Sequence, residues 1–389
     1  MKISESRSCL TACPAGHIDS TTAPALEEAL FSALSGHPGL PLQLNLSGVT
    51  YISSAGLRLL MALSRRCSLT LTEVSPEVYE TLQITGFTQL FPVKKRMREL
   101  SLEGCPVIGE GAIGTVYRLD ADTIVKLYKS PDCLPMIENE LLMSRKAFLR
   151  GIPTAIPFDV VRVGESYGTV FELVKAQSLD DLLIAEPERQ EELTRAYVEL
   201  LKRTHEVEMT PGELPDARDI YLGYLDQLGG VLPEAISARV RALLKEMPAS
   251  LHPVHGDLQP KNVMMSDGEP LLIDMDTLSA GDPVFEFAGL YTDLIAFDTE
   301  EPGNSMAFFG LSSERTRRLF EDSLSGYLGS PEAAEAALPR IRVLSDIRFL
   351  YLLTVLRIDR EDLRELRVRR VVGELPGLLA GVDGLGMVC

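Results

Sequence analysis

The sequence predicts an α/β domain over residues 1–97, followed by a larger α+β domain over residues 98–389. At roughly 150 residues per domain, a chain of 389 residues has room for two or three domains. Residues 1–100 carry nine basic and eight acidic side chains, whereas the rest of the chain carries 29 and 48, a net charge of −19. Strands alternate with helices in the first part, and a strand-rich segment precedes a helical one in the second. The change of charge and of pattern places the boundary in the basic stretch 94–99.

The composition is that of a globular protein in a reducing compartment. The six cysteines have no paired spacing, which argues against a disulfide scaffold and against a zinc module. A formal net charge of −18 disfavours nucleic acids and anionic membranes as partners. No segment reaches the roughly 18 apolar residues of a spanning helix, and the first residues do not have the pattern of a signal peptide. We therefore expect a cytoplasmic protein.

The elements of the first domain follow from capping residues and from apolar spacing. We expect helices over about 24–34 and 57–63 and strands over 42–46 and 69–72. Ser75, Pro76 and Glu77 are a cap, a first-turn proline and a first-turn acid, which together predict the start of another helix.

The second domain divides into a strand-rich part and a helical part. Strand signals dominate residues 101–176, and apolar spacing predicts a helix over 184–208. Short strands are expected at 263–265 and 271–273, and the pattern from about 283 to 379 is mainly helical.

A run of small hydroxyl residues lies where a strand of the first domain meets a helix. In Ile52-Ser53-Ser54-Ala55-Gly56 a serine can cap the helix, whose free N–H groups also favour an anion such as a phosphate. The run resembles the motif of STAS domains, the modules of anti-sigma-factor antagonists. The resemblance extends to residues 16–19, 46–48 and 82–91.

This resemblance implies a small sheet covered by helices and an anti-sigma-factor-like partner. It also implies a switch by phosphorylation of one serine, which is Ser54 in this sequence, although Ser53 stands where the motif has Asp. A phosphate on Ser54 would add about −1.5 to −2 charges, enough to make or break a contact with a partner.

The second domain opens with the pattern Gly-x-Gly-x-x-Gly-x-Val, formed by Gly109, Gly111, Gly114 and Val116. In a dinucleotide site such a loop opens a helix. Here residues 115–117 and 123–125 flank the polar residues 120–122, which predicts a β-hairpin instead. A glycine-rich hairpin lets backbone N–H groups approach phosphates.

Lys126 ends the strand that follows this hairpin and is therefore placed to hold the α- and β-phosphates of a nucleotide. Its partner on the next helix is expected to be Glu140, with Glu138 as the competing candidate. A salt bridge on the surface is the alternative for this lysine.

The segment His255-Gly256-Asp257-Leu258-Gln259-Pro260-Lys261-Asn262 is the strongest signal in the chain. Asp257 and Asn262 have the Asp-x-x-x-x-Asn spacing of a phosphotransfer loop, with a carboxylate for the acceptor hydroxyl and an amide oxygen for magnesium. Asp274, at the end of the apolar strand 271–273, can reach the same magnesium ion. We expect His255 to brace the loop, and Asp276 either assists or caps the next segment.

These four motifs, in this order, resemble the aminoglycoside phosphotransferase and choline-kinase-like branch of the protein-kinase fold. The resemblance covers residues 101 to about 380 and implies a two-lobed α+β fold, with a five-stranded N-lobe (about 101–170) and a helical C-lobe (about 175–389). It implies ATP and Mg²⁺ as cofactors, with the adenine bound to the backbone between Glu172 and Val174. Gln259 replaces the lysine of typical protein kinases, and a long activation loop is absent from the sequence.

The sequence leaves three functions open. The first is an ATP- and Mg²⁺-dependent phosphotransferase that acts on a hydroxyl of a small molecule and carries a STAS regulatory or partner-binding module. The second is a signalling switch in which the kinase-like domain phosphorylates a protein serine such as Ser54. The third is a non-catalytic pseudokinase scaffold that binds a nucleotide; the presence of Lys126, Asp257, Asn262 and Asp274 argues against it.

Overall fold

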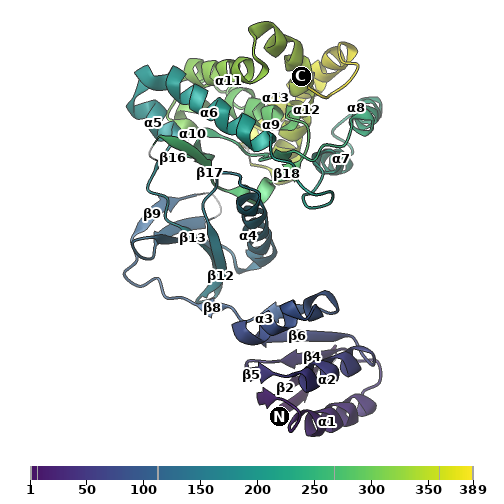
Figure 1. Cartoon of the computed structure of the whole chain (residues 1–389). Coiled ribbons are helices and arrows are strands. Elements are labelled where there is room, and N and C mark those ends of the chain that lie inside the picture. The colour runs from purple at the N-terminus through teal and green to yellow at the C-terminus, as the bar shows by residue number, and fades with distance from the viewer. Residues whose placement is uncertain (1, 7, 112–113, 267, 359, 388–389) are drawn as a thin grey trace. The chain divides into compact units, whose positions relative to one another are not determined.

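The computed structural model describes residues 2–6, 8–111, 114–266, 268–358 and 360–387 (Figure 1). The chain divides into two compact units, Met1–Leu100 and Ser101–Cys389. Ala112 and Ile113, inside the predicted glycine-rich loop, lie outside the described residues. None of the helices in the described ranges combines the length and the apolar character that crossing a bilayer requires.

The first unit is built on a mainly parallel sheet with the strand order β1-β2-β4-β6-β7. Its strands are β1 (Lys2–Glu5), β2 (Leu10–Cys13), β4 (Leu42–Asn45), β6 (Leu69–Val74) and β7 (Val93–Lys95). Only β1 pairs in the antiparallel sense among the described strands of this sheet. A separate parallel pair joins β3 (Ala15–Ile18) and β5 (Gly48–Ile52).

Three helices cover the apolar residues of this first sheet. They are α1 (Ala23–Gly36), α2 (Ser54–Ser64) and α3 (Pro76–Ile84), and the turn η1 (Phe87–Gln89) follows them. Leu30, Leu60 and Leu82 bury one face of each helix in a common core with Leu44 and Leu71 of the strands. The α/β prediction for this unit is confirmed.

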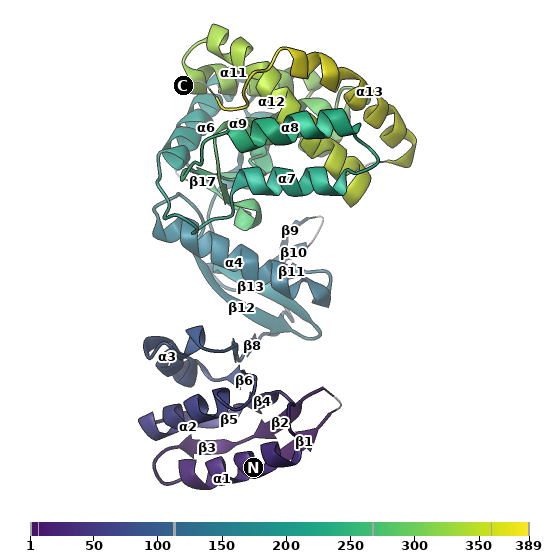
Figure 2. The ribbon, with the colours of Figure 1, turned by 90° about the vertical axis from the view of Figure 1, so that its right-hand side faces the viewer.

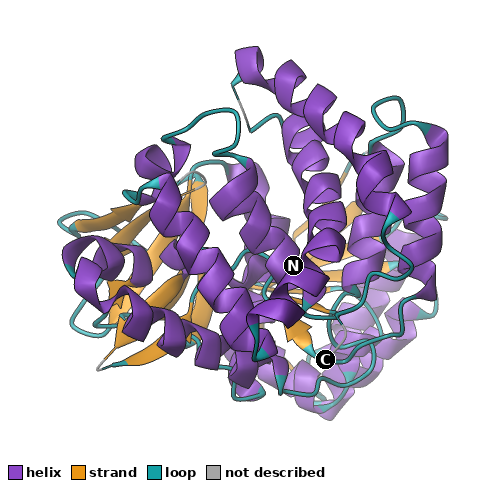
Figure 3. Ribbon diagram, turned by 90° about the horizontal axis from the view of Figure 1, so that it is seen from above, coloured by secondary structure: helices purple, strands orange, loops and turns teal. Residues whose placement is uncertain are grey.

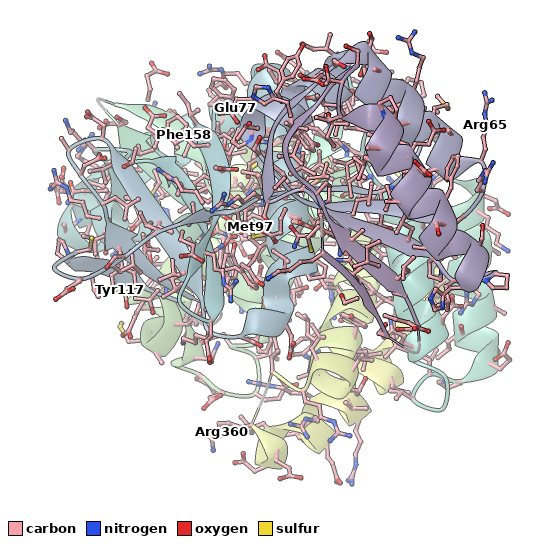
Figure 4. The ribbon with its side chains drawn as sticks, turned by 90° about the horizontal axis from the view of Figure 1, so that it is seen from below. Arg65, Glu77, Met97, Tyr117, Phe158 and Arg360 are labelled. Carbon is pink, nitrogen blue, oxygen red and sulfur yellow. The ribbon has the colours of Figure 1, made fainter. Side chains whose placement is uncertain are left out.

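The predicted start of α3 is confirmed in detail. The Ser75 hydroxyl accepts a hydrogen bond from the Val78 N–H at 3.4 Å, and Pro76 is the first helical residue. Glu77 lies in the first turn (Figure 4). Hydrogen bonds from its own backbone N–H and from the Ser75 hydroxyl hold the pKa of Glu77 below its usual value.

The second unit begins with an antiparallel sheet in which five strands run in the order β12-β13-β11-β10-β9. They are β9 (Val107–Glu110), β10 (Gly114–Arg118), β11 (Thr123–Tyr128), β12 (Pro157–Val163) and β13 (Ser166–Glu172), and β8 (Arg98–Glu99) precedes them. The turn η2 (Pro131–Cys133) leads into α4 (Leu134–Leu149), which packs against β12 and β13 (Figure 1). Phe158 of β12 stays exposed (Figure 4). The hairpin β10–β11 confirms the prediction made from residues 115–125.

The rest of the second unit is mainly helical, as Figure 3 shows. Its helices are α5 (Leu179–Ala185), α6 (Gln190–His205), α7 (Ala217–Gln227), α8 (Glu234–Glu246), α9 (Val284–Tyr291), α10 (Asn304–Phe309), α11 (Ser313–Leu328), α12 (Pro331–Tyr351) and α13 (Glu361–Ala380). Helices α7 and α8 lie side by side (Figure 2). Helix α9 is buried along its apolar length and packs against α12.

Short strands and turns lie between these helices. Asp257, Asn262 and Asp274 lie in or next to them. The strands are β14 (Gln177–Ser178), β15 (Pro253–Val254), β16 (Val263–Ser266), β17 (Glu269–Leu272) and β18 (Ser279–Ala280). The 3₁₀ turns are η3 (Pro187–Arg189), η4 (Pro260–Asn262) and η5 (Met275–Thr277), and two π-helical segments, η6 (Thr292–Ala296) and η7 (Leu352–Leu356), extend α9 and α12.

Candidate active site

Lys126 is the centre of a charged cluster in the second unit. It lies on β11 directly opposite Val116 of β10. Its Nζ atom donates to Glu140 Oε1 of α4 at 2.8 Å and to Asp274 Oδ1 at 2.7 Å. Burial alone would lower the pKa of Lys126, but the charges of Asp274 and Glu140 outweigh burial and raise the pKa above its usual value. The lysine is therefore charged at neutral pH, and Glu138, the other candidate partner, is exposed.

Asp274 adopts a backbone conformation that is unusual for a residue other than glycine. Its φ is 64° and its ψ is 61°, in the left-handed region. Such conformations cost on the order of 1–3 kcal/mol and collect at functional sites. The turn η5 follows directly, and burial and then the Asp274 charge raise the pKa of Asp276 to about 6.

Asp257 and Asn262 are held together within one short loop. The Asn262 Nδ2 atom donates to the Asp257 carbonyl at 2.7 Å and to Asp257 Oδ2 at 3.1 Å. Ile273, next to Asp274, donates its N–H to the Asn262 carbonyl at 3.0 Å, and its own carbonyl lies 2.9 Å from His255 Nε2. These bonds join the loop to the segment that carries Asp274.

Glu286 holds the backbone of this loop and was missed in the sequence analysis. It is 1% exposed on α9, and its carboxylate accepts the N–H groups of His255 at 2.7 Å and of Gly256 at 3.0 Å. His205 Nε2, from the end of α6, lies 3.5 Å from the same carboxylate. Burial raises the pKa of Glu286, but its interactions with His205 and then with His255 together outweigh burial and bring the pKa below its usual value. An acid inside the apolar run 284–290 was the signal that could have found it.

Arg348 of α12 is a second residue that the sequence analysis missed. Its Nη2 atom donates to Asp257 Oδ1 at 3.3 Å, and its Nη1 atom donates to Asp293 Oδ1 at 2.9 Å. Burial would lower the pKa of Arg348, but the charges of Asp293 and Asp257 outweigh it. No local motif indicates Arg348, because it lies on α12, 91 residues after Asp257 in the sequence.

The three glycines of the predicted pattern lie in the hairpin that β9 forms with β10, and they differ in what their backbone positions allow. A Cβ atom on Gly114 would lie 2.6 Å from the Leu127 carbonyl oxygen, so packing between strands requires glycine there. A Cβ atom on Gly109 or Gly111 would meet its neighbours no closer than 3.6 Å. Packing does not account for these two glycines.

The expected adenine-binding segment runs along the end of β13. The N–H of Glu172 donates to the Ile156 carbonyl at 3.0 Å, and the N–H of Leu173 donates to the Asp122 carbonyl at 2.7 Å. The Val174 carbonyl accepts from Ala176 at 3.0 Å. None of these bonds uses the carbonyl of Glu172 or the N–H of Val174.

Ser54 belongs to the other unit, where it is the first residue of α2 and is exposed. Ser53 is the N-cap residue, and its hydroxyl accepts the Ala55 N–H at 3.2 Å. Gly56 is required by packing, because a Cβ atom there would lie 2.7 Å from the Ile18 carbonyl oxygen. The cap and the glycine explain this motif structurally, whereas the exposed Ser54 hydroxyl has no such explanation.

Comparison with known proteins identifies both units. A model of the phosphotransferase enzyme family matches residues 104–320, more than half of the chain. The chain belongs to this family. A STAS domain model matches residues 3–94, so this phosphotransferase-family chain also carries a STAS domain.

Individual relatives are similar to parts of the chain. "Putative anti-sigma factor antagonist BtrV" of Bordetella bronchiseptica is 36% identical over 89 residues, which are 22% of this chain and 76% of that protein. The structure of ADP-bound aminoglycoside phosphotransferase APH(2'')-Ib is 15% identical, covering 77% of this chain and 98% of its own, with a TM-score of 0.47. A choline/ethanolamine kinase family protein from Mesorhizobium loti is 17% identical, covering 71% and 91%, with a TM-score of 0.47.

The residues of this phosphotransferase-family chain fit a magnesium ion that is held jointly with phosphate groups. Both bonds that orient Asn262 use its amide nitrogen, which leaves the amide oxygen unused by them. Asp274 adds a carboxylate, and its side chain is about one-third exposed. The described residues hold no group of three or more His, Cys, Asp or Glu side chains suited to a metal. Mg²⁺ commonly takes one or two protein oxygens and completes its shell with phosphates and water.

Proposed function

We propose that this protein transfers the γ-phosphoryl group of ATP, with Mg²⁺, to a hydroxyl group of a small molecule, and that its STAS domain regulates the enzyme or binds a partner. The observation that carries the proposal is the position of Lys126 between Glu140 and Asp274. In this arrangement the Lys126 ammonium group, which can bind phosphates, lies next to the Asp274 carboxylate, which can bind a metal ion. It joins β11, α4 and the segment after β17, which are far apart in the sequence.

Each side chain of the site has a role in this reaction. Lys126 binds the α- and β-phosphates, and Gly109 and Gly111 let the hairpin backbone approach them. Asn262 and Asp274 would hold Mg²⁺ through their side-chain oxygens, and the bound ion would neutralise phosphate charge. Asp257 accepts the proton of the acceptor hydroxyl as the new O–P bond forms and the bond from the γ-phosphorus to the ADP oxygen breaks.

The STAS domain supports a regulatory role that is separate from this chemistry. Its similarity to an antagonist of anti-sigma factors favours an anti-sigma-factor-like partner. The excess of 19 negative charges after residue 100 favours a cationic acceptor, such as an amino alcohol, over an anionic one.

The experiment measures ADP formation by the full chain with ATP and Mg²⁺ over a panel of hydroxyl compounds that includes cationic and neutral members. Lys126→Met is the matched inactive variant, because it removes the cation and leaves Asp257 in place. We expect acceptor-dependent ADP formation that disappears in this variant. ADP formation at the same rate in Lys126→Met would contradict the proposal.

A second candidate acceptor is Ser54 of the STAS domain. The favouring observation is its exposed hydroxyl at the N-terminus of α2, where the helix dipole and Arg58, one turn later, would stabilise a phosphate. Incubation with γ-labelled ATP and mass spectrometry of the chain test it. Label that is lost in Ser54→Ala but kept in Ser53→Ala would support it, whereas label that persists in Ser54→Ala would exclude Ser54. Nucleotide binding without any transfer would instead indicate the pseudokinase scaffold.

A further inference from the structure

Asp257 has a partner on each of its carboxylate oxygens. Arg348 Nη2 donates to Oδ1 at 3.3 Å. Gln259 Nε2 donates to Oδ2 at 3.2 Å, and Asn262 Nδ2 donates to the same oxygen at 3.1 Å. A carboxylate bound on both oxygens has a fixed plane, so the direction in which it can receive a proton is fixed as well.

Gln259 and Asn262 lie in the same loop as Asp257, whereas Arg348 comes from α12. Arg348 is therefore the contact in this set that ties the carboxylate to the frame of the helical lobe. Its side chain is 12% exposed, and its Nη1 atom is bound to Asp293 Oδ1 at 2.9 Å and to the Gly289 carbonyl at 3.3 Å. Both Nη atoms of Arg348 donate to protein oxygens. The guanidinium group is therefore arranged to position the Asp257 side chain.

The surroundings keep Arg348 at this place. A Cβ atom on Gly289 would lie 3.3 Å from the Gly256 carbonyl oxygen and 3.9 Å from the guanidinium carbon of Arg348, so α9 passes close to both the loop and the arginine. Thr292 and Ser345, both fully buried, join α12 to the segment after α9 through hydroxyls 2.9 Å apart.

The carboxylate that binds the Nη1 atom of Arg348 lies in an irregular helical segment. Asp293 belongs to the π-helical segment η6, and the π-helical segment η7, which follows α12, begins four residues after Arg348. Such segments interrupt regular helices and occur frequently at functional sites. Here one of them places a carboxylate opposite the guanidinium group.

We propose that Arg348 is a positioning residue, which through the chain Asp293–Arg348–Asp257 orients the Asp257 carboxylate toward the acceptor hydroxyl. This inference rests on the proposed function, because it takes Asp257 as the group that receives the acceptor's proton. A misplacement of about 1 Å at a reacting group can cost a hundredfold in rate, so the loss of one tether is sufficient for a large effect.

An ion pair can also serve stability alone, and α12 supplies a half-buried pair as a control for that case. Arg342, on the same helix, pairs with Glu374 of α13 at 2.8 Å and makes no hydrogen bond or ion pair with the catalytic loop in the described structure. Arg342→Met therefore removes an arginine and its ion pair from α12 without touching Asp257. A stability role predicts the same behaviour for Arg342→Met and Arg348→Met.

The test measures single-turnover loss of the γ-phosphate from MgATP by the full chain, with water as acceptor and with any acceptor found in the compound panel. ATP binding is titrated in parallel. We expect Arg348→Met to lower the transfer rate about a hundredfold while the ATP dissociation constant stays within about twofold. Arg348→Lys, which keeps the charge, should recover part of the rate, Asp293→Asn should give an intermediate loss, and Arg342→Met should transfer at the wild-type rate.

The outcomes separate this inference from the function on which it rests. A wild-type protein that transfers phosphate, with Arg348→Met as active as Arg342→Met, would overturn the positioning role and leave the proposed function intact. A rate loss in Arg348→Met that is matched by the loss of ATP binding would also overturn it. A wild-type protein that binds no ATP, or binds it and transfers nothing, would overturn the proposed function and the inference together.

Discussion

The three glycines of the β9–β10 hairpin are explained by two different requirements, packing between strands and the approach of a phosphate. Gly114 is required by the Leu127 carbonyl oxygen, 2.6 Å from the place of a Cβ atom. Gly109 and Gly111 have room for a side chain in the structure, so we attribute them to the approach of a phosphate.

This difference predicts opposite effects of two alanine substitutions. Gly114→Ala should destabilise the protein by about 1–3 kcal/mol through overpacking. Gly111→Ala should change stability by less than about 1 kcal/mol but weaken ATP binding. Urea denaturation and nucleotide titration of both variants check this. Equal stability losses with unchanged ATP binding in Gly111→Ala would contradict the phosphate role.

The site was predictable where its residues are local in sequence. Asp257 and Asn262 lie five residues apart, and Lys126 follows a hairpin whose turn residues are recognisable. Glu286 and Arg348 were missed, because their partners lie 31 and 91 residues away and only the folded chain brings them together. Each is a charged residue within an apolar run, a signal that marks burial but does not name the partner.

Helix α12 contains a buried acidic side chain. On α12, Asp346 is 2% exposed, and its Oδ2 atom has no hydrogen-bond partner among the described residues. Burial raises the pKa of Asp346 to about 7, although Arg370 and Arg342 oppose this and Glu374 and Glu300 add to it. The carboxyl group thus keeps its proton in the folded protein far above its pKa in the unfolded chain, about 3.9.

The raised pKa of Asp346 makes the stability of the folded protein depend on pH, and proton linkage gives the sign of this dependence. Between about pH 4 and pH 7 the folded state binds the proton of Asp346 and the unfolded state does not, so this group's contribution to stability falls as the pH rises. Asp346→Asn cannot titrate, and its stability relative to wild type should rise by roughly 2–4 kcal/mol from pH 4 to pH 8.

Urea denaturation of wild type and Asp346→Asn across this range makes the comparison. Asp322→Asn, at an exposed position on α11, is the control for the substitution itself. A difference between Asp346→Asn and wild type that stays constant with pH would contradict the buried, protonated carboxyl group.

Elements were predictable from local patterns, but their extents were set by tertiary packing. The cap at Ser75 and the hairpin at residues 115–125 were confirmed because capping and turn residues act locally. Pro339 and Pro376 lie inside α12 and α13, where the sequence alone would favour a break. Burial of the neighbouring residues, such as Ile341 and Leu375, keeps both helices continuous.

At the scale of the whole molecule, the two units have separate cores. The core of the first unit ends at Phe91, and the core of the helical part of the second begins at Met143, with no shared residue. Unequal charge on the two parts of the sequence already favoured such a division.

Separate cores predict that each unit folds without the other. Fragments 1–100 and 101–389 should each unfold cooperatively, at temperatures within a few degrees of two transitions of the intact chain. Calorimetry of the three proteins measures this. A fragment 1–100 without a transition, or one transition of the intact chain that neither fragment reproduces, would show that the units depend on each other.

The proposed mechanism depends on Asp257 receiving the acceptor's proton during phosphoryl transfer from MgATP. Single-turnover release of the γ-phosphate by wild type and Asp257→Asn, at saturating MgATP, tests this role. We expect a rate lower by roughly 10²- to 10⁴-fold in Asp257→Asn, with ATP bound as tightly as in wild type. Equal rates in the two proteins would contradict it.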